Sequence, residues 1–457
     1  MKKLLVSFLC IIMVMVFVPT MAFAAENNDY FEVTKNGVTE KFPTAVDAVA
    51  SVKDGETATI KLLDNYSGGG VKVEGTGKNI TFDLNGKTWE IGTPLVGSTG
   101  TETNAFQLLK DNTVTFKNGE IKSDKALILI QNYANLTIDN VDLSLTTPGT
   151  GNYAASNNNG KTVIKGGSTI TVSEGNYAMD SFNFGTSYAG VDVVIEDAYI
   201  IGDVEIANGG KIKMTGGGIE GDVIVHNYAY DEHANDESKF EMENGLIVGD
   251  VKTSEKGNTT FNGGVVEGTV SLDSSKGAKA VVNNGLFMKV GENVTVAGDV
   301  TVDFAADGEN VTAVGGAYVE EMLKVMEEVL TPEQLAQVVM TVKKAPAGYE
   351  AKVPAGVTVV NSAGNEIVVN GNKVAADDKL VVEKPSTDKP GTGDTGSGNA
   401  GDNNGNGNAG ANTEAPDKSE GDTPKTGDEA NMLPWLALMA AAAGATGIAA
   451  FKKRENQ

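Results

Sequence analysis

From about Asn79 to Val302 the chain alternates apolar and polar positions in short runs, and each run ends at a small polar pair that usually contains glycine. Alternation with a period of two places one side chain inward and the next outward along a β-strand. Asparagine and glycine adopt the left-handed backbone conformations that tight corners need. The pattern therefore predicts a succession of short strands joined by corners.

The corners recur along the chain at intervals that average about 25 residues. The clearest copies are Leu84-Asn85-Gly86, Lys117-Asn118-Gly119, Glu243-Asn244-Gly245, Phe261-Asn262-Gly263 and Asn283-Asn284-Gly285. A second corner follows the first, and it reads Gly-Asp-Val at 202–204, 221–223, 249–251 and 298–300. Such a period favours an all-β solenoid, with a right-handed parallel β-helix as the best match. A series of β-sandwiches is the alternative.

Apolar positions at helical spacing flank this repeat. They predict a helix at Thr44 to Val52 and a second at Val319 to Leu330. A capping box at Thr331-Pro332-Glu333-Gln334 then predicts the start of a third helix. Because an open solenoid end exposes apolar side chains, we interpret these helices as caps. The helix-then-strand start resembles the N-terminal entry of pectate-lyase-like β-helices.

The expected organisation has six parts. Residues 1–24 form a signal peptide, and a β-helix with an N-terminal cap follows at 25–312. A helical capping segment at 313–345 leads to a small β unit at 346–383, which contains an Asn370-Gly371 hairpin. A disordered spacer at 384–422 and a C-terminal signal at 423–457 complete the chain. The spacer is polar and contains no aromatic, Val, Leu or Ile residue, so it cannot bury a core.

The N-terminus predicts secretion. Lys2 and Lys3 precede an apolar run from Leu4 to Val18, and Ala22-Phe23-Ala24 supplies a small-x-small cleavage site. A retained membrane anchor is the alternative interpretation.

The C-terminus contains Thr423-Pro424-Lys425-Thr426-Gly427, an uncharged run at 432–451 and the basic tail Lys452-Lys453-Arg454. The run is long enough to cross a bilayer as a helix. This three-part order resembles the cell-wall sorting signal of Gram-positive surface proteins. The resemblance implies that a sortase cleaves after Thr426 and joins it to peptidoglycan, so that the membrane is occupied only transiently. Thr423 replaces the Leu of the family motif, and a plain membrane anchor is the alternative.

Charge and composition exclude some classes of function for this protein. The full chain carries a net charge of −25, its only Arg is Arg454 and its only Cys is Cys10. Without the two cleaved ends the protein retains 31 basic and 58 acidic residues, a balance of about −27. This excess of negative charge disfavours nucleic acid, and the single Cys excludes a disulfide framework.

The same features disfavour catalysis. β-Helix enzymes of the pectate-lyase type use Arg or Lys with metal-binding carboxylates, or clustered aspartates with His, whereas this solenoid has no Arg. The sequence therefore predicts no catalytic residue, no metal and no cofactor. A carbohydrate-active enzyme remains the alternative.

Two acidic groups are candidate metal sites. The first is the corner series Asp203, Asp222, Asp250 and Asp299, which is interpreted as turn residues. The second is the polar insertion at 228–237 that His226 and His233 flank, which is interpreted as a surface loop. Asp377-Asp378, the only adjacent Asp pair, falls outside the coils.

Asn-Tyr-Ala occurs four times, at 132–134, 152–154, 176–178 and 227–229. Spacings of 20, 24 and 51 residues match whole coils, so the copies are expected to stack as ladders, with the tyrosines inside. The less regular segment that follows contains Phe182, Phe184 and Tyr188, which are the candidate sugar-binding residues. The resulting hypothesis is a secreted, wall-anchored, non-catalytic adhesin whose partners are sortase, peptidoglycan and glycans. A surface-coat protein is a third possibility.

Overall fold

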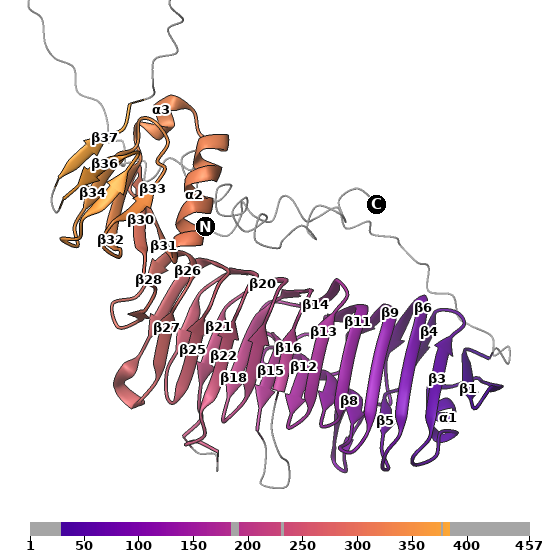
Figure 1. Ribbon diagram of the computed structural model, residues 1–457. Coiled ribbons are helices and arrows are strands. Elements are labelled where there is room, and N and C mark those ends of the chain that lie inside the picture. The colour runs from indigo at the N-terminus through magenta and orange to yellow at the C-terminus, as the bar shows by residue number, and fades with distance from the viewer. Residues whose placement is uncertain (1–28, 184–191, 230–232, 376–377, 384–457) are drawn as a thin grey trace, which may run out of the picture.

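The computed structural model describes residues 29–183, 192–229, 233–375 and 378–383. The chain is mostly β, and Figure 1 shows its strands stacked side by side along one axis. Strands of successive coils pair in parallel and extend one sheet through the whole stack. The prediction of an all-β parallel solenoid is therefore confirmed.

Each coil has three faces. The first face contains β3 (Thr57–Leu62), β6 (Asn79–Ile91), β9 (Thr113–Ser123), β11 (Asn135–Leu145), β13 (Lys161–Lys165), β16 (Asp192–Ile195), β19 (Lys211–Met214), β22 (Ser238–Met242), β25 (Gly257–Phe261), β27 (Lys279–Val282) and β29 (Thr295–Val296).

The second face contains β4 (Tyr66–Gly68), the second halves of β6, β9 and β11, and then β14 (Ser168–Val172), β17 (Ala198–Ile201), β20 (Gly218–Glu220), β23 (Leu246–Val248), β26 (Val265–Leu272) and β28 (Gly285–Val290).

The third face contains β5 (Val71–Val73), β8 (Thr101–Leu108), β10 (Ile128–Asn132), β12 (Tyr153–Asn158), β15 (Tyr177–Phe182), β18 (Asp203–Ala207), β21 (Val223–His226), β24 (Val251–Thr253) and the end of β26. A short strand, β7 (Val96–Ser98), pairs antiparallel with β8, and the 3₁₀ turn η2 (Ser274–Lys276) follows β26.

Between the first and second faces the chain turns at asparagine corners, one of which is the predicted corner at Asn118. Asn118 and Asn140 have φ angles of 61° and 56°, which lie in the left-handed region. The Nδ2 atom of Asn140 donates to Oδ1 of Asn118 at 3.3 Å, so the corner side chains bridge neighbouring coils. Asparagine thus supplies both the backbone conformation and a contact along the stack.

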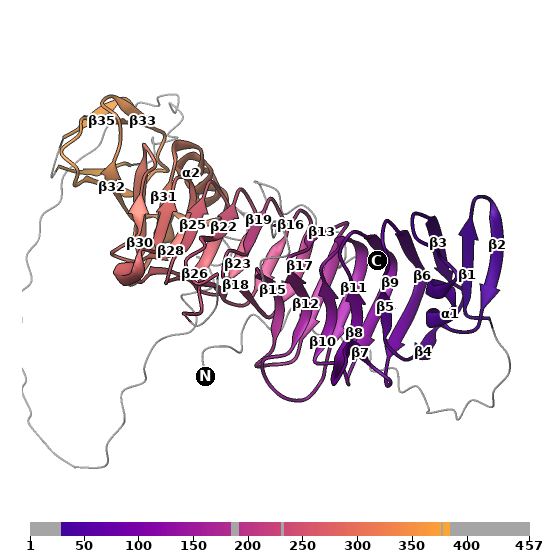
Figure 2. The ribbon, with the colours of Figure 1, turned by 90° about the horizontal axis from the view of Figure 1, so that it is seen from below.

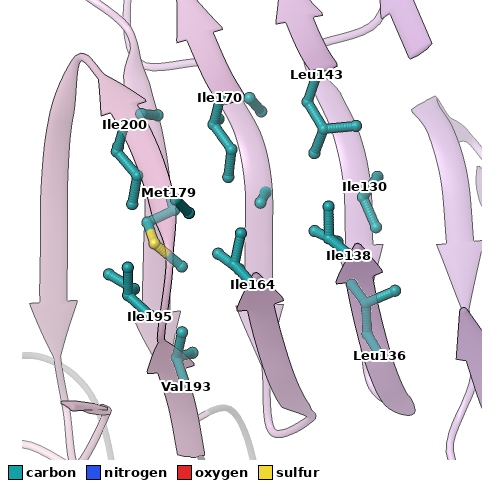
Figure 3. Packing of buried hydrophobic residues seen from close by; sticks show 14 of the residues in the cluster. Ile130, Leu136, Ile138, Leu143, Ile164, Ile170, Met179, Val193, Ile195 and Ile200 are labelled. Atoms are coloured by element: carbon teal, nitrogen blue, oxygen red, sulfur yellow. The ribbon is translucent and has the colours of Figure 1, made fainter. Parts of the chain in front are cut away.

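The interior is filled by one column of apolar side chains after another. In the first coils it is aromatic, and the rings of Phe82 and Phe116 stack at 5.0 Å between centroids. In the middle coils it is aliphatic, and Figure 3 shows Ile138, Ile164 and Ile195 in line across three coils. Burial of these side chains is the main stabilising term of the stack.

At the N-terminal end, β1 (Phe31–Lys35) pairs antiparallel with both β2 (Val38–Phe42) and β3. The helix α1 (Ala45–Ala50) is shorter than predicted, and its N-cap is Thr44, whose side chain accepts from the Asp47 amide at 3.1 Å. Ala45, Ala48 and Val49 of α1 are buried in the core of the first coils.

At the other end, β30 (Thr301–Ala306) and β31 (Glu309–Val314) lead into α2 (Gly316–Val329) and α3 (Pro332–Leu335). The predicted capping box is present: the Thr331 amide donates to Gln334 Oε1 at 2.9 Å, and the Gln334 amide donates to Thr331 Oγ1 at 3.3 Å. Val319, Met322 and Met326 of α2 share a cluster with Leu246, Val265 and Leu286 of the coils. Figures 1 and 2 place this unit opposite the β1–β2 hairpin.

The helical segment ends sooner than its apolar pattern predicts. The helical capping segment predicted at 313–345 gives way to a strand, because Val339 begins β32 (Val339–Lys344). β-Branched residues favour strands, and β32 pairs with β30 and with β34 (Thr358–Asn361).

The remaining strands form the small β unit. β37 (Lys379–Val381) pairs with β34, and a separate sheet contains β33 (Tyr349–Ala351), β35 (Ile367–Val369) and β36 (Asn372–Val374). Asn370 and Gly371 join β35 to β36 with φ angles of 47° and 79°, which confirms the predicted hairpin.

Candidate ligand-binding strip

The third face carries a line of polar side chains at one register position. Five successive coils contribute Gln107, Gln131, Ser156, Asp180 and Glu205, which we call the polar strip. Neighbouring strands lie about 4.8 Å apart, so the four steps span roughly 19 Å. The strip is therefore long enough for several sugar units.

Strand alternation directs these side chains outward. The preceding residues in four of the coils, Phe106, Ile130, Met179 and Val204, are fully buried in the core. Figure 3 shows Ile130 and Met179 on the inner side of their strands. The next residue must then lie on the outer side.

An outer position is normally solvated, but most of the strip is not. Asp180 is 6% exposed and Glu205 is 3% exposed, although both belong to the outer side of the third face. Carboxylates are seldom buried to this extent unless they have partners. The two buried carboxyls therefore need partners within the protein, which the next contacts supply.

Glu205 is held by three aromatic donors from other coils. Its carboxylate accepts from the Tyr153 hydroxyl at 3.2 Å and from His226 Nε2 at 3.0 Å, and also from the Tyr228 hydroxyl. Burial by itself raises the pKa of this carboxyl. The hydrogen bonds from His226, Tyr228 and Tyr153 outweigh burial, and the pKa of Glu205 is lowered.

Asp180 occupies the neighbouring coil, and its pKa shifts in the opposite direction. Its Oδ1 accepts from the Asn157 amide at 2.9 Å. Burial raises the pKa of Asp180 to about 7; a hydrogen bond from Ser156 opposes the rise and the negative charge of Glu205 adds to it. Near neutral pH the two adjacent carboxyls therefore differ in charge, because Glu205 is ionised while Asp180 is partly protonated.

Aromatic rings border these two carboxyls. Tyr153 and Tyr177 pair in register, and their rings stack at 5.1 Å with an interplanar angle of 11°. Tyr228 packs edge-on against His226 at 4.6 Å. Burial raises the pKa of the Tyr153 hydroxyl, and the neighbouring Glu205 charge raises it further. Tyr153 thus remains neutral and donates its hydroxyl hydrogen to Glu205.

The other half of the strip consists of carboxamides. Gln131 Oε1 accepts from Asn104 Nδ2 at 2.8 Å and from Gln107 Nε2 at 3.0 Å. Gln131 Nε2 in turn donates to Asn158 Oδ1 at 3.3 Å. Gln107 is 5% exposed, and its Oε1 has no hydrogen-bond partner among the described residues. Amides of neighbouring coils thus form one network with a single acceptor left over.

The predicted sugar-binding residues fall at the edge of this site. Phe182 ends β15, is half-buried, and lies 6.3 Å from Tyr228 between ring centroids. Phe184 and Tyr188 lie outside the described residues, as do Thr423, Pro424, Lys425, Thr426 and Gly427 of the sorting signal.

The four Asn-Tyr-Ala copies do not form one ladder, which corrects the expectation. Only the copies at 152–154 and 176–178 share a register. The copy at 132–134 starts where β10 ends, and there Asn132 pairs with Asn157. The copy at 227–229 follows β21. Similar spacing in sequence does not ensure the same place in a coil, because the corners differ in length.

The tyrosines were also expected inside the solenoid, and this is wrong for Tyr153 and Tyr177. Both are half-buried, and the Tyr153 hydroxyl reaches Glu205 on the outer side. The asparagines are the buried members: Asn176 Oδ1 accepts from the Asn152 amide at 3.0 Å. The motif thus places its amide in the corner and its ring outside.

The Gly-Asp-Val series has a structural role, in agreement with its interpretation as turn residues. Asp203, Asp222 and Asp250 each accept, through Oδ1, from a backbone amide of the next coil at 2.8–2.9 Å. The last of these amides belongs to Thr269, so the row does not continue directly to Asp299. Lys252 Nζ also lies 2.6 Å from Asp222 Oδ2.

The two histidines belong to different environments. His226 is part of the Glu205 network, whereas Nδ1 of His233 lies 2.6 Å from Asp236 Oδ2. Among the residues that the structure describes, no three His, Cys, Asp or Glu side chains are grouped as a metal site would require.

Sequence reasoning missed Asp180 and Glu205. The available signal was local: Val204-Glu205-Ile206 places one carboxylate between two β-branched residues in mid-strand. Alternation alone predicts an exposed Glu there, and the covering rings come from residues that are distant in sequence.

Comparison of the chain with protein-family models, with curated proteins and with solved structures finds no match. Within the described ranges, no helix is long and apolar enough to span a membrane, and the run at 432–451 lies outside them.

Proposed function

We propose that this protein is a non-catalytic surface protein of a Gram-positive cell wall that binds glycans along the polar strip. The observation that carries the proposal is the buried line of amide and carboxyl side chains, bordered by tyrosines, on the outer side of five successive coils. Polar groups so placed are suited to a ligand that lies along the solenoid axis.

The chemistry of the strip suits carbohydrate. Sugar hydroxyls both donate and accept, and carboxamides and carboxyls offer both functions in return. Binding sites commonly combine such polar groups with aromatic walls. The stacked rings of Tyr153 and Tyr177 already contact each other, so their outer surfaces and edges are what a sugar would meet. Phe182 extends this border.

The glycan experiment uses the protein released from the wall and an array of neutral, amino and acidic oligosaccharides. We expect selective binding that weakens at least tenfold in Tyr177→Leu, because the variant removes one ring and keeps an apolar side chain. Glu120→Gln on the second face is the control. If no glycan bound the wild-type protein, the proposal would fail and a coat role would be favoured.

The wall attachment rests on the sorting-signal resemblance. Lysozyme-class digestion should release the protein with a murein fragment on Thr426. Release by detergent, with residues 432–457 still attached, would instead indicate a membrane anchor.

Glycan hydrolysis is a second candidate, favoured by the adjacent Asp180 and Glu205. An acid–base pair needs one protonated and one ionised carboxyl, and the two environments differ in that sense. Binding without cleavage remains the first proposal because three donors already occupy the Glu205 carboxylate. If the wild-type protein released new reducing ends from a glycan, and if Asp180→Asn and Glu205→Gln each abolished that release, hydrolysis would become the first proposal.

Finer features of the fold belong to the same proposal. Right-handed winding is the expected hand, since parallel crossovers are right-handed in about 98% of cases. We assign α1 and the α2–α3 pair as caps, and the apolar contacts of α1 and α2 with the end coils support this role. An experimental structure would test both.

A further inference from the structure

We propose that the first coils of the solenoid bind the surface of ice through the outer side of the first face. This second binding surface is independent of the glycan site on the third face. It consists of two columns of short polar side chains that cross β3, β6, β9 and β11, and Figure 1 shows these four strands side by side. We call the two columns the threonine array.

The first column of the array consists entirely of threonine. The parallel pairing of the four strands brings one threonine of each strand into register, and these residues are Thr59, Thr81, Thr115 and Thr137. The antiparallel hairpin at the N-terminal end extends the column, because Thr34 of β1 pairs with Thr59 and with Thr39 of β2. Six adjacent strands thus carry threonine at the same position.

The second column lies two residues earlier in each strand and alternates threonine with asparagine. Its members are Thr57, Asn79, Thr113 and Asn135. The residues between the columns, such as Ile80 and Val114, are fully buried in the core, so both columns point outward. Two residues of a strand span roughly 6.6 Å, and this is the distance between the columns.

The polar groups of the array are free to contact a ligand. None of its eight side chains makes a hydrogen bond with any residue that the structure describes, whereas Thr88 on the second face donates to Glu120 at 2.7 Å. Thr57, Thr59, Asn79 and Asn135 are exposed, and the other four are partly exposed. A ligand can therefore reach these hydroxyls and amides from solvent.

The composition of the array disfavours the commoner classes of partner. Small-molecule sites are concave, and protein interfaces bury aromatic and apolar side chains at their centre, but the array is the outer side of a sheet and contains neither. The column beside it alternates lysine with aspartate, as at Lys61 and Asp83, so the face has no net attraction for a polyion. A regular array of neutral hydrogen-bonding groups instead suits a regular surface of the same kind.

The spacing along each column matches that of hydrogen-bonded water. Neighbouring strands place their threonines about 4.8 Å apart. Waters in ice are tetrahedral and bonded at about 2.75 Å, so the oxygens of two waters that share a neighbour are about 4.5 Å apart. The mismatch is about 0.3 Å per strand and reaches only about 1 Å across the four coils. The hydroxyls can thus contact a row of lattice oxygens together, and simultaneous weak contacts add up.

Slow growth of ice from a solution of the whole released protein tests the inference. A protein that binds ice is incorporated into the growing crystal, whereas an inert solute is left in the liquid. We expect the wild-type protein to be enriched in the ice fraction relative to serum albumin in the same solution. It should also slow the recrystallisation of small ice grains.

A bulky substitution locates the binding surface. Thr115→Tyr places a ring at the centre of the array and holds the lattice away from the neighbouring threonines. We expect at least about tenfold lower affinity for ice, which corresponds to the loss of one or two hydrogen bonds. Thr81→Tyr repeats the test in the adjacent coil. Thr171→Tyr is the matched control, because Thr171 is a partly exposed threonine of β14 on the second face.

Denaturant melts first establish that the three variants are folded. Exclusion of the wild-type protein from ice, or equal incorporation of the wild type, Thr115→Tyr and Thr81→Tyr, would overturn the inference. Loss of incorporation in Thr171→Tyr alone would also overturn it. Each of these results leaves the glycan site untouched, since its residues lie on the third face.

A crystalline polysaccharide is the competing partner, and powdered cellulose and chitin serve as its probes. Adsorption to either powder that Thr115→Tyr abolishes, without enrichment in ice, would assign the array to that polymer and overturn the proposal. Enrichment in ice that Thr115→Tyr and Thr81→Tyr abolish and Thr171→Tyr preserves is the result that we expect.

Discussion

The first and third faces of the solenoid differ in the arrangement and burial of their charged residues. On the first face, Lys61, Asp83, Lys117, Asp139 and Lys165 share one register position, and their sign alternates from coil to coil. Lys117 lies 3.4 Å from Asp83, and Lys165 lies 4.0 Å from Asp139. These side chains remain partly exposed, so water solvates them and each neighbour neutralises the next.

On the third face, two carboxyl side chains, Asp180 and Glu205, occupy adjacent coils and are buried, with no basic residue between them in the register. Like charges in neighbouring strands repel, and burial adds a desolvation cost. A solenoid needs no such pair to stack, as the first face demonstrates. The difference indicates that the third face is arranged for something other than stability, which is why we place the ligand there.

The largest expected effect comes from Glu205→Gln. The variant leaves Tyr153, Tyr228 and His226 without their charged acceptor, so we expect about 2–4 kcal/mol loss of unfolding free energy at pH 7. Denaturant melts measure it. The matched control is Glu241→Gln on the partly exposed first face, which should cost less than about 1 kcal/mol. Equal losses would remove the contrast between the two faces.

Asp180→Asn should stabilise the protein, with a strength that depends on pH. In the folded state the pKa of Asp180 is raised to about 7, above its ordinary value, so ionisation is disfavoured on folding. The wild type therefore loses stability as pH rises from about 4 to about 7. The variant avoids this loss and should gain on the order of 1–3 kcal/mol at pH 8. Thermal melts at pH 5 and pH 8 test the sign; a smaller gain at pH 8 than at pH 5 would contradict the assignment.

Tyr153→Phe should have a smaller effect than either carboxyl variant. It removes one hydrogen bond to Glu205 and keeps the stacked ring, so we expect about 1 kcal/mol loss. Tyr177→Phe is the control because its hydroxyl makes no hydrogen bond to any residue that the structure describes, and it should change stability by less than about 0.5 kcal/mol. A loss in Tyr177→Phe as large as that in Tyr153→Phe would show that the effect does not come from the hydrogen bond to Glu205.

Lys117→Gln should have the smallest effect. Partly exposed ion pairs contribute little, so we expect less than about 0.5 kcal/mol. A measurable loss that disappears in high salt would mean that the alternating charges of the first face act together as a network.

The alternating pattern and the corner residues were sufficient to predict the solenoid. Asn85 and Asn118 lie at the corners where the pattern placed them, and the capping box at Thr331 is present. Each of these features depends on residues close together in sequence, so local chemistry decides it.

The polar strip could not be predicted in the same way. Glu205 contacts Tyr153, which is 52 residues earlier, and Tyr228, which is 23 residues later. Their meeting depends on the length of every intervening coil. Because the coils differ in length, the four Asn-Tyr-Ala copies also lie at different register positions, although their spacing in whole coils predicted one ladder.

The central claim is that the third face binds glycan and the first face does not. Calorimetric titration of the best oligosaccharide from the array into wild type, Tyr177→Leu and Lys117→Ala tests it most directly, after melts confirm that all three proteins are folded. We predict at least tenfold weaker binding for Tyr177→Leu and unchanged binding for Lys117→Ala. Equal affinity of all three proteins, or a loss confined to Lys117→Ala, would contradict the claim.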